Sequence, residues 1–165
     1  MKRKILVGLL AAVIFAAAAF VVNITPGVET GSVVLTCDGN SYELPGEETV
    51  RYYGGKTENL SADKSFEERL SSVPSFNVKA AVDKEGSVTL KTPMSVEVKG
   101  DILGDVLYTV YSYDGDVLSK ASKKLELPKE DIDGCLVKIT IKWGEKSKSY
   151  LEEDYWFAAM YNTER

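Results

Sequence analysis

The chain has 165 residues, 44% of them hydrophobic, a formal net charge of −5 and no histidine at all. The missing histidines remove the commonest general base and the commonest metal ligand, and an acidic chain disfavours nucleic acid, whose phosphates need cationic neutralisation. The composition therefore predicts no catalytic residues, no metal site, no cofactor and no nucleic-acid partner.

The N-terminus reads as a membrane segment. A basic start, residues 1–4, leads into an uninterrupted apolar run from Ile5 to Val22. About 20 apolar residues span the hydrocarbon core of a bilayer as a helix, and basic residues on one side keep that side in the cytoplasm. The pattern predicts a single-pass anchor in the cell membrane, with its N-terminus cytoplasmic and residues 23–165 outside.

A cleaved secretory signal is the alternative interpretation. Residues 5–15 would form its short apolar region, and the four alanines at 16–19 supply small-residue cleavage sites. The apolar residues 20–22 continue the run beyond those alanines, which favours the anchor. Cleavage would give a secreted protein, and both interpretations export the remainder of the chain.

The exported part is expected to form one acidic domain. We expect a spacer at residues 23–30, a domain at 31–161 and a short tail at 162–165. Of the 20 basic residues three precede Ile5, which leaves 17 against 25 acidic residues and a net charge of −8. About 140 residues are enough for a single domain with its own core.

The exported sequence has the pattern of short antiparallel strands. Runs with alternating polar and apolar residues are separated by clusters of turn residues, and Asp114-Gly115 favours a tight hairpin because both residues accept positive φ. The expected strands cover residues 32–37, 41–44, 76–82, 87–91, 94–99, 107–113, 117–120, 135–143 and 150–161.

One segment has helical spacing instead. Phe66, Leu70 and Val73 recur at helical intervals within residues 61–73, with Ser61 as an expected N-cap and Pro74 after the end. Seven to nine short strands with one helix predict a mainly β domain. We expect two packed antiparallel sheets, as in immunoglobulin or fibronectin-III β-sandwiches.

A late segment resembles the immunoglobulin-like sandwich more directly. The stretch LELPKEDIDGCLVKITIKW is similar to the corner that enters a late strand of such domains, with acidic residues and a glycine before a long alternating strand. The tyrosine expected soon after that glycine is absent, because Leu136 and Val137 follow Cys135. Both tryptophans, Trp143 and Trp156, also follow Cys135. The resemblance therefore concerns architecture and implies no particular family.

The two cysteines have two interpretations. Cys37 and Cys135 both lie on apolar faces of expected strands, in a compartment where disulfides form. A bridge would close a loop of about 100 residues and contribute about 4–5 kcal/mol in the chain-entropy model. Alternatively, both are buried thiols that pack as small hydrophobic groups. No histidine is present to activate either thiol as a nucleophile.

Aromatic and acidic side chains complete the candidates. Tyr155, Trp156, Phe157 and Tyr161 crowd the last strand, where alternate residues face opposite sides. They predict either core packing or an exposed aromatic surface for a sugar or a protein. The densest acidic cluster is Glu152, Glu153 and Asp154. The acidic turns at 101–105, 114–116 and 131–134 do not match a twelve-residue calcium loop.

Three functional hypotheses follow. The first is a membrane-anchored extracytoplasmic module for protein binding or envelope assembly, without catalysis. The second is a secreted or surface carbohydrate-binding domain with exposed aromatic side chains. The third is a hydrolase, which we disfavour because no nucleophile–base arrangement is evident. An exposed aromatic strip would favour sugar, and an apolar patch or open edge strand would favour protein. The sequence does not predict an oligomeric state.

Overall fold

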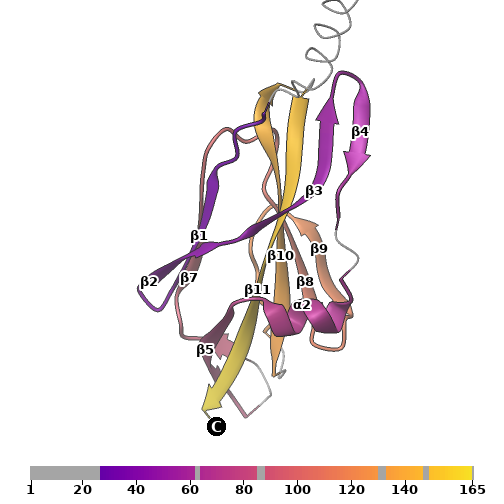
Figure 1. The fold of residues 1–165 in the computed structure, drawn as a ribbon. Coiled ribbons are helices and arrows are strands. Elements are labelled where there is room, and N and C mark those ends of the chain that lie inside the picture. The colour runs from indigo at the N-terminus through magenta and orange to yellow at the C-terminus, as the bar shows by residue number, and fades with distance from the viewer. Residues whose placement is uncertain (1–26, 62–63, 85–87, 130–132, 147–148, 165) are drawn as a thin grey trace, which may run out of the picture.

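The structure is a computed structural model that describes residues 27–61, 64–84, 88–129, 133–146 and 149–164. They form a mainly β domain with one short helix, and its antiparallel sheets include a curled half-barrel (Figure 1). The predicted anchor, from Ile5 to Val22, lies outside the described residues. Within the described ranges, no helix is long and apolar enough to cross a membrane.

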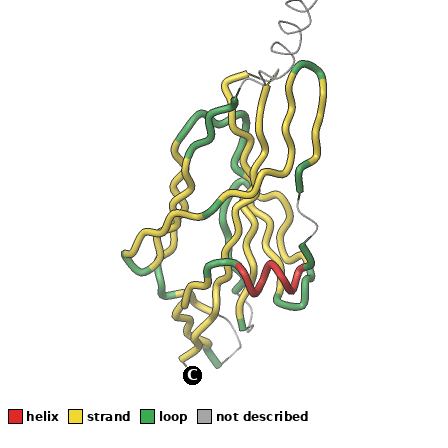
Figure 2. The backbone as a smooth tube through the Cα atoms, in the orientation of Figure 1, coloured by secondary structure: helices red, strands yellow, loops and turns green. Residues whose placement is uncertain are grey.

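Strands account for most of the described chain (Figure 2). In chain order the elements are β1 (Ser32–Cys37), β2 (Asn40–Leu44), β3 (Gly46–Tyr53), β4 (Lys56–Asn59), α2 (Phe66–Ser72), β5 (Ser75–Val82), β6 (Val88–Leu90), β7 (Met94–Lys99), β8 (Leu107–Ser112), β9 (Val117–Ser122), β10 (Gly134–Lys146) and β11 (Ser149–Glu164).

The smaller sheet has three strands in the order β2-β1-β7. Strands β1 and β2 form a hairpin closed by Asp38 and Gly39, whose φ angles of 50° and 79° are the left-handed values that a two-residue turn requires. Strand β7 pairs antiparallel with β1 along its whole length, from Ser32↔Lys99 to Cys37↔Met94, without a register shift. This sheet is therefore short and regular.

The larger sheet is built around β11. Its order is β4-β3-β11-β10-β8-β9, and β5 pairs with β11 and β6 beside this path. One edge of β11 is shared by two strands: β3 pairs antiparallel with Ser149–Tyr155, and β5 pairs parallel with Ala158–Glu164. Strand β11 is thus a central strand whose other edge pairs with β10.

The core lies between the two sheets. On β10, the inward side chains of Cys135, Val137, Ile139, Ile141 and Trp143 have no exposed surface, and Val33 and Leu35 of β1 face them from the smaller sheet. Gly100 allows the close approach at one end: its φ is 130°, and a Cβ there would lie 3.0 Å from the Trp143 ring. The alternation of β10 therefore supplies much of the core.

The opposite face of the larger sheet is covered by α2. Leu136, Trp156 and Ala158 are buried there, and Phe66, Leu70 and Val73 of the helix region pack against them. Helix α2 begins at a capping box, in which Ser65 Oγ accepts from Glu68 N–H and the Glu68 carboxylate accepts from Ser65 N–H. Both faces of β11 are consequently covered in this part of the sheet.

The fold class agrees with the sequence predictions, whereas two strands, the start of the helix and one strand pairing differ from them. The mainly β domain with one short helix is confirmed, and the predicted bounds of β1 and β7 coincide with the observed ones. Strands β3 and β4 were not predicted, because neither has alternating apolar residues. The helix is shorter than residues 61–73, with Ser65 rather than Ser61 as N-cap. The β5–β11 pair is parallel, which the expected antiparallel topology did not include.

Candidate functional site

A groove of about 520 Å³ lies beside β6 and β7. Its lining residues come from the β6–β7 connection and from the segment between β9 and β10: Leu90, Thr92, Met94, Lys124, Leu125, Glu126, Leu127 and Lys129. The apolar members are only partly buried although they pack against the core. The groove is therefore an opening in the side of the core.

Hydrogen bonds fix the segment that forms the outer wall of this groove. Val88 N–H donates to the Lys129 carbonyl at 3.3 Å, and the Tyr161 hydroxyl donates to the Pro128 carbonyl at 2.8 Å. At the other end, Ser122 Oγ donates to the Lys124 carbonyl at 2.8 Å. The wall is thus attached to β6 and β11 at its Pro128–Lys129 end, and a local bond between Ser122 and Lys124 shapes its start.

Strand β7 presents an open edge at the same place. Met94, its first residue, lines the groove, and within the described residues β7 pairs only with β1. The hairpin turn after Cys37 and the hydrogen bond from Asp38 N–H to the Pro93 carbonyl at 3.2 Å fix the alternation of the β1–β7 ladder. Every second residue of β7 therefore turns its N–H and C=O away from β1.

A second candidate lies under α2, where charged and aromatic groups surround Trp156. The Arg69 guanidinium lies 4.6 Å from the centroid of the Trp156 ring, and Lys138 Nζ lies 5.7 Å from it. Tyr111 stacks on the same indole with centroids 6.0 Å apart. Such cation–π contacts are worth about 0.5–2 kcal/mol each, so this cluster fastens the helix to the sheet.

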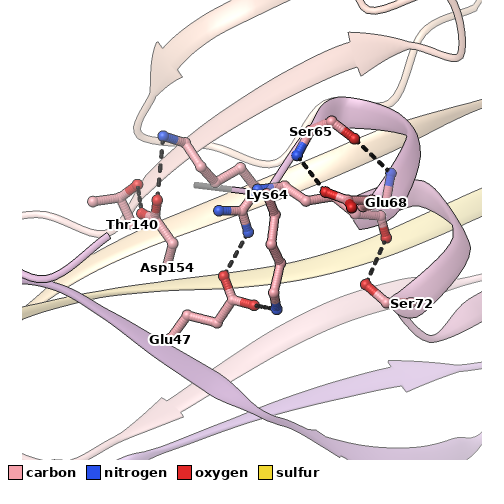
Figure 3. Close-up of polar contacts among 9 residues, drawn as sticks. Glu47, Lys64, Ser65, Glu68, Ser72, Thr140 and Asp154 are labelled. Carbon is pink, nitrogen blue, oxygen red and sulfur yellow. Dashed lines mark hydrogen bonds and ion pairs between the residues drawn. The ribbon is translucent and has the colours of Figure 1, made fainter. Parts of the chain in front are cut away.

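Two carboxylates balance the cations of this cluster (Figure 3). Glu47 of β3 accepts from both Lys64 and Arg69, while Asp154 accepts from Thr140 Oγ1 at 2.6 Å and lies 3.5 Å from Lys138 Nζ. Burial alone would raise the pKa of the Glu47 carboxyl, but the hydrogen bonds and charges of Lys64 and Arg69 outweigh it and lower that pKa.

The Trp156 indole leaves one polar atom without a partner. Its Nε1 is buried and has no hydrogen-bond partner among the described residues. A neighbouring hollow of about 250 Å³, lined in part by Pro45, Glu47 and Lys64, touches the ring. Because Nε1 itself has no exposed surface, this atom is a local energetic cost that the stacking contacts offset.

A third candidate is a buried carboxylate inside the core. Glu153 is 8% exposed, and its Oε2 accepts from Trp143 Nε1 at 2.7 Å and from the Tyr155 hydroxyl. Burial, followed by the hydrogen bond and charge of Glu153, raises the pKa of Tyr155. Gly46 is required here, since a Cβ would lie 2.9 Å from the Tyr155 ring. The three side chains form a closed structural network.

The predicted acidic cluster is divided between the faces of β11. Glu153 points into the core, whereas Glu152 lies 3.5 Å from Lys142 Nζ and Asp154 contacts Thr140 and Lys138 on the outer face. The three carboxylates therefore do not converge on one site. Among the described residues, no three His, Cys, Asp or Glu side chains are grouped so that they could hold a metal ion.

The segment at Asp114-Gly115 is a turn, but not the tight two-residue hairpin expected: β8 ends at Ser112, β9 begins at Val117, and Gly115 has a positive φ of 92° whereas Asp114 does not. In the hairpin at Asp114-Gly115, Gly115 N–H donates to the Ser112 carbonyl at 3.1 Å and Asp116 N–H donates to Ser112 Oγ at 3.1 Å. Asp131 and Ile132, in the third acidic turn, lie outside the described residues.

The two cysteines are free, buried thiols. Cys37 contacts the Asn77 carbonyl at 4.0 Å, and burial, followed by the charge of Asp38, raises the pKa of its thiol. Burial raises the pKa of Cys135 to about 11. In this structure the two thiols are not bonded to each other, and both are buried among core side chains.

The four C-terminal aromatic residues do not form an exposed surface. Tyr155 and Phe157 belong to the core between the sheets, Trp156 lies under α2, and Tyr161 is half-buried. The reason is the position of β11, a central strand with both faces covered. The exposed large hydrophobic side chains are instead Tyr42, Val117, Leu118 and Met160.

The groove beside β7 was missed at the sequence level. Its residues come from three separate places in the chain, and only the alternation of β7 gave any signal. No family model matches the sequence, and neither a curated protein nor a solved structure is significantly similar to the chain.

Proposed function

We propose that this chain is a membrane-anchored extracytoplasmic module that binds a protein partner and performs no catalysis. Residues 5–22 act as the anchor, the basic residues 1–4 stay in the cytoplasm, and the β domain stands outside the cell membrane. The basic start and the uninterrupted apolar run support this topology.

The observation that carries protein binding is the open side of the core beside β7. An apolar groove next to an unpaired, regular strand edge is the kind of surface to which a polypeptide can add both side-chain and backbone contacts. The half-buried apolar residues Met94, Leu125 and Leu127 gain most from being covered.

Carbohydrate binding is the second candidate, supported by a different aromatic pair. Tyr52 and Tyr150 stack with ring centroids 5.1 Å apart, and Lys142 Nζ lies 5.2 Å from the Tyr150 ring. Both tyrosines are only partly buried, so one ring face could take a sugar. The hollow beside Tyr52, lined in part by Glu48 and Ser149, has a volume of about 270 Å³ against about 520 Å³ for the groove, and we rank this candidate second.

The finer architecture is also part of the proposal. Two sheets that share one core support an immunoglobulin-like or fibronectin-III-like sandwich. The parallel β5–β11 pair and the division of one edge of β11 between two strands depart from that pattern.

Site-specific photocrosslinking in intact cells tests the proposed binding. A photoreactive phenylalanine analogue replaces Lys124 at the groove or, as the control, Lys56 on the exposed strand β4. We expect a discrete adduct of higher mass from position 124 and none from position 56. Equal adducts from both positions, or none from either, would contradict a protein partner at the groove.

The topology is tested separately by labelling and sequencing. An exposed L118C variant should react with a membrane-impermeant maleimide added to intact cells, whereas a K4C variant should not. N-terminal sequencing of the mature chain then separates anchor from signal peptide. A start at residue 1 or 2 supports the anchor, and a start near Phe20 refutes it.

A further inference from the structure

We propose that the groove partner is an extended, acidic segment of another protein, which adds as a strand to the free edge of β7. One end of the added strand passes Met94 and enters the groove, which lies between the β6–β7 connection on one side and residues 124–129 on the other. This inference rests on the proposed function and specifies how and with what chemistry the partner binds.

The backbone of β7 is arranged for such an addition. Because Asp38 N–H bonds to the opposite Pro93 carbonyl, the residues of β7 that bond to β1 are Ser95, Glu97 and Lys99. Met94, Val96 and Val98 therefore direct their N–H and C=O groups to the open edge. These free groups form an unshifted row over six residues, which is what an added strand requires.

The side chains of the same residues show that the core is open on this side. Met94, Val96 and Val98 are only partly buried, whereas their neighbours across the ladder, Val33 and Leu35, have no exposed surface. An added strand would cover the exposed parts of the β7 residues with its own inward side chains. Because inward and outward positions alternate, its sequence must alternate apolar and polar residues.

The other strand edges are less suited to this addition. Strand β9 exposes Val117 and Leu118, but its pairing with β8 has two register shifts, and such bulges deter further pairing. Strand β4 has four residues, all polar and exposed. Strand β2 has four exposed residues and a buried Leu44. Of these edges in the described part of the chain, β7 is the one that combines a regular free ladder with an adjacent apolar groove.

Charge indicates the character of the partner segment. The exported chain has a net charge of −8 from 17 basic and 25 acidic residues, but the groove is lined by Lys124 and Lys129 against the single carboxylate of Glu126. Lys124 Nζ lies 3.6 Å from the Glu126 carboxylate, so Lys129 carries the unbalanced charge, and the lining has a net charge of +1 in an acidic domain. A segment with carboxylates at its polar positions is therefore the complementary ligand.

Two synthetic peptides test the inference on the full chain in detergent micelles. Each has nine residues with valine at alternate positions; one has two aspartates among the polar positions, and the other has lysines there. We expect the aspartate peptide to bind at least tenfold more tightly by fluorescence anisotropy. It should slow hydrogen exchange at the amides of Val96 and Val98 at least tenfold, with little change at Glu97.

Substitutions localise the effect. The double variant K124E/K129E should weaken binding of the aspartate peptide at least tenfold, and the control K56E on β4 should not change it. Val96→Pro removes one free N–H from the open edge without removing a bond to β1, and should weaken binding similarly. If this variant fails to fold, the surface double variant still decides the question.

The outcomes separate this inference from the proposed function. Equal affinity for both peptides, protection at β9 or β2 instead of β7, or binding unchanged by K124E/K129E would each overturn strand addition at β7. If those results accompany a specific adduct from position 124 in cells, a protein partner remains and only its mode of binding is wrong. Loss of the adduct as well would refute both.

Discussion

The two sides of the larger sheet are covered in different ways. On the outer face, α2 is fastened by a capping box, by the Glu47 ion pairs and by cations over Trp156. On the inner face, the smaller sheet covers most of the core, but beside β7 it leaves a groove of about 520 Å³. One side is closed by specific contacts, and the other is left open.

This difference between the two faces separates contacts that stabilise the fold from a surface that is open to another molecule. A helix of seven residues contributes little stability by itself, so its polar and aromatic contacts with the sheet are what hold it on this face. At the open side, hydrogen bonds such as that from Tyr161 to the Pro128 carbonyl hold the wall of the groove, but its apolar side chains stay half-buried. A domain that leaves part of its core uncovered gives up stability there, which is the cost expected of the binding surface that we propose.

The largest effect is expected from removing the Trp156 side chain, which lies at the centre of the face covered by α2. Trp156→Ala deletes the ring on which Arg69, Lys138 and Tyr111 pack, and should lower the free energy of unfolding by about 3–5 kcal/mol. Leu127→Ala at the open side should cost only about 1 kcal/mol, because its side chain is half-buried. Urea unfolding measures both; equal losses would contradict the distinction between the two sides.

Removing the helix cap should have a smaller effect. Ser65→Ala leaves Glu68 N–H without its acceptor and should cost about 1 kcal/mol. Ser71→Ala, which removes a hydroxyl from the exposed side of the same helix, is the matched control. A thermal melt that shows no difference between the two variants would mean that the capping box does not hold α2.

The Glu47 ion pairs predict a modest pH dependence. The pKa of this carboxyl is lowered in the fold, so its contribution is present above the unfolded pKa of about 4.3 and is lost as pH falls through the lower folded pKa. Glu47→Gln should therefore reduce stability at pH 7 by no more than about 1 kcal/mol. The variant and the parent should converge in acid-titrated urea melts; a constant difference would exclude the ionic origin.

The reactivity of the two thiols shows which part of the fold opens first, and no substitution is needed to measure it. Both cysteines are buried with raised pKa values, so iodoacetamide at pH 8 should leave the folded chain unmodified. With increasing urea we expect Cys37, which pairs with Met94 at the open side, to react before Cys135. Mass spectrometry of tryptic peptides gives the order, and the reverse order would place the weaker side elsewhere.

The sequence predicted secondary structure and burial best where apolar residues recur at every second position. In β10, five inward residues at alternate positions from Cys135 to Trp143 predicted a strand and its buried face, and all five are fully buried. In β3 and β4 no such alternation exists: β3 follows directly after Pro45, where the chain passes from the smaller to the larger sheet, and β4 is an exposed edge. Their pairing depends on partners that local sequence cannot identify.

The candidate sites were hardest to predict because the exposure of their side chains depends on which elements cover each face of the sheet. Tyr155, Trp156 and Phe157 are indistinguishable in sequence from an exposed aromatic strip; the coverage of β11 by α2 on one face and by the smaller sheet on the other decides their burial. Likewise, Leu90, Met94 and Leu127 meet only in the folded chain. The alternation of apolar and polar residues predicted which face of a strand each side chain occupies. Tertiary packing decided whether that face is exposed.

The central position of β11 has a consequence for assembly. This strand follows every other described strand in the chain, yet β10, β3 and β5 all pair with it. The larger sheet therefore cannot close until residues 149–164 have been synthesised, and folding must wait for contacts of long sequence separation.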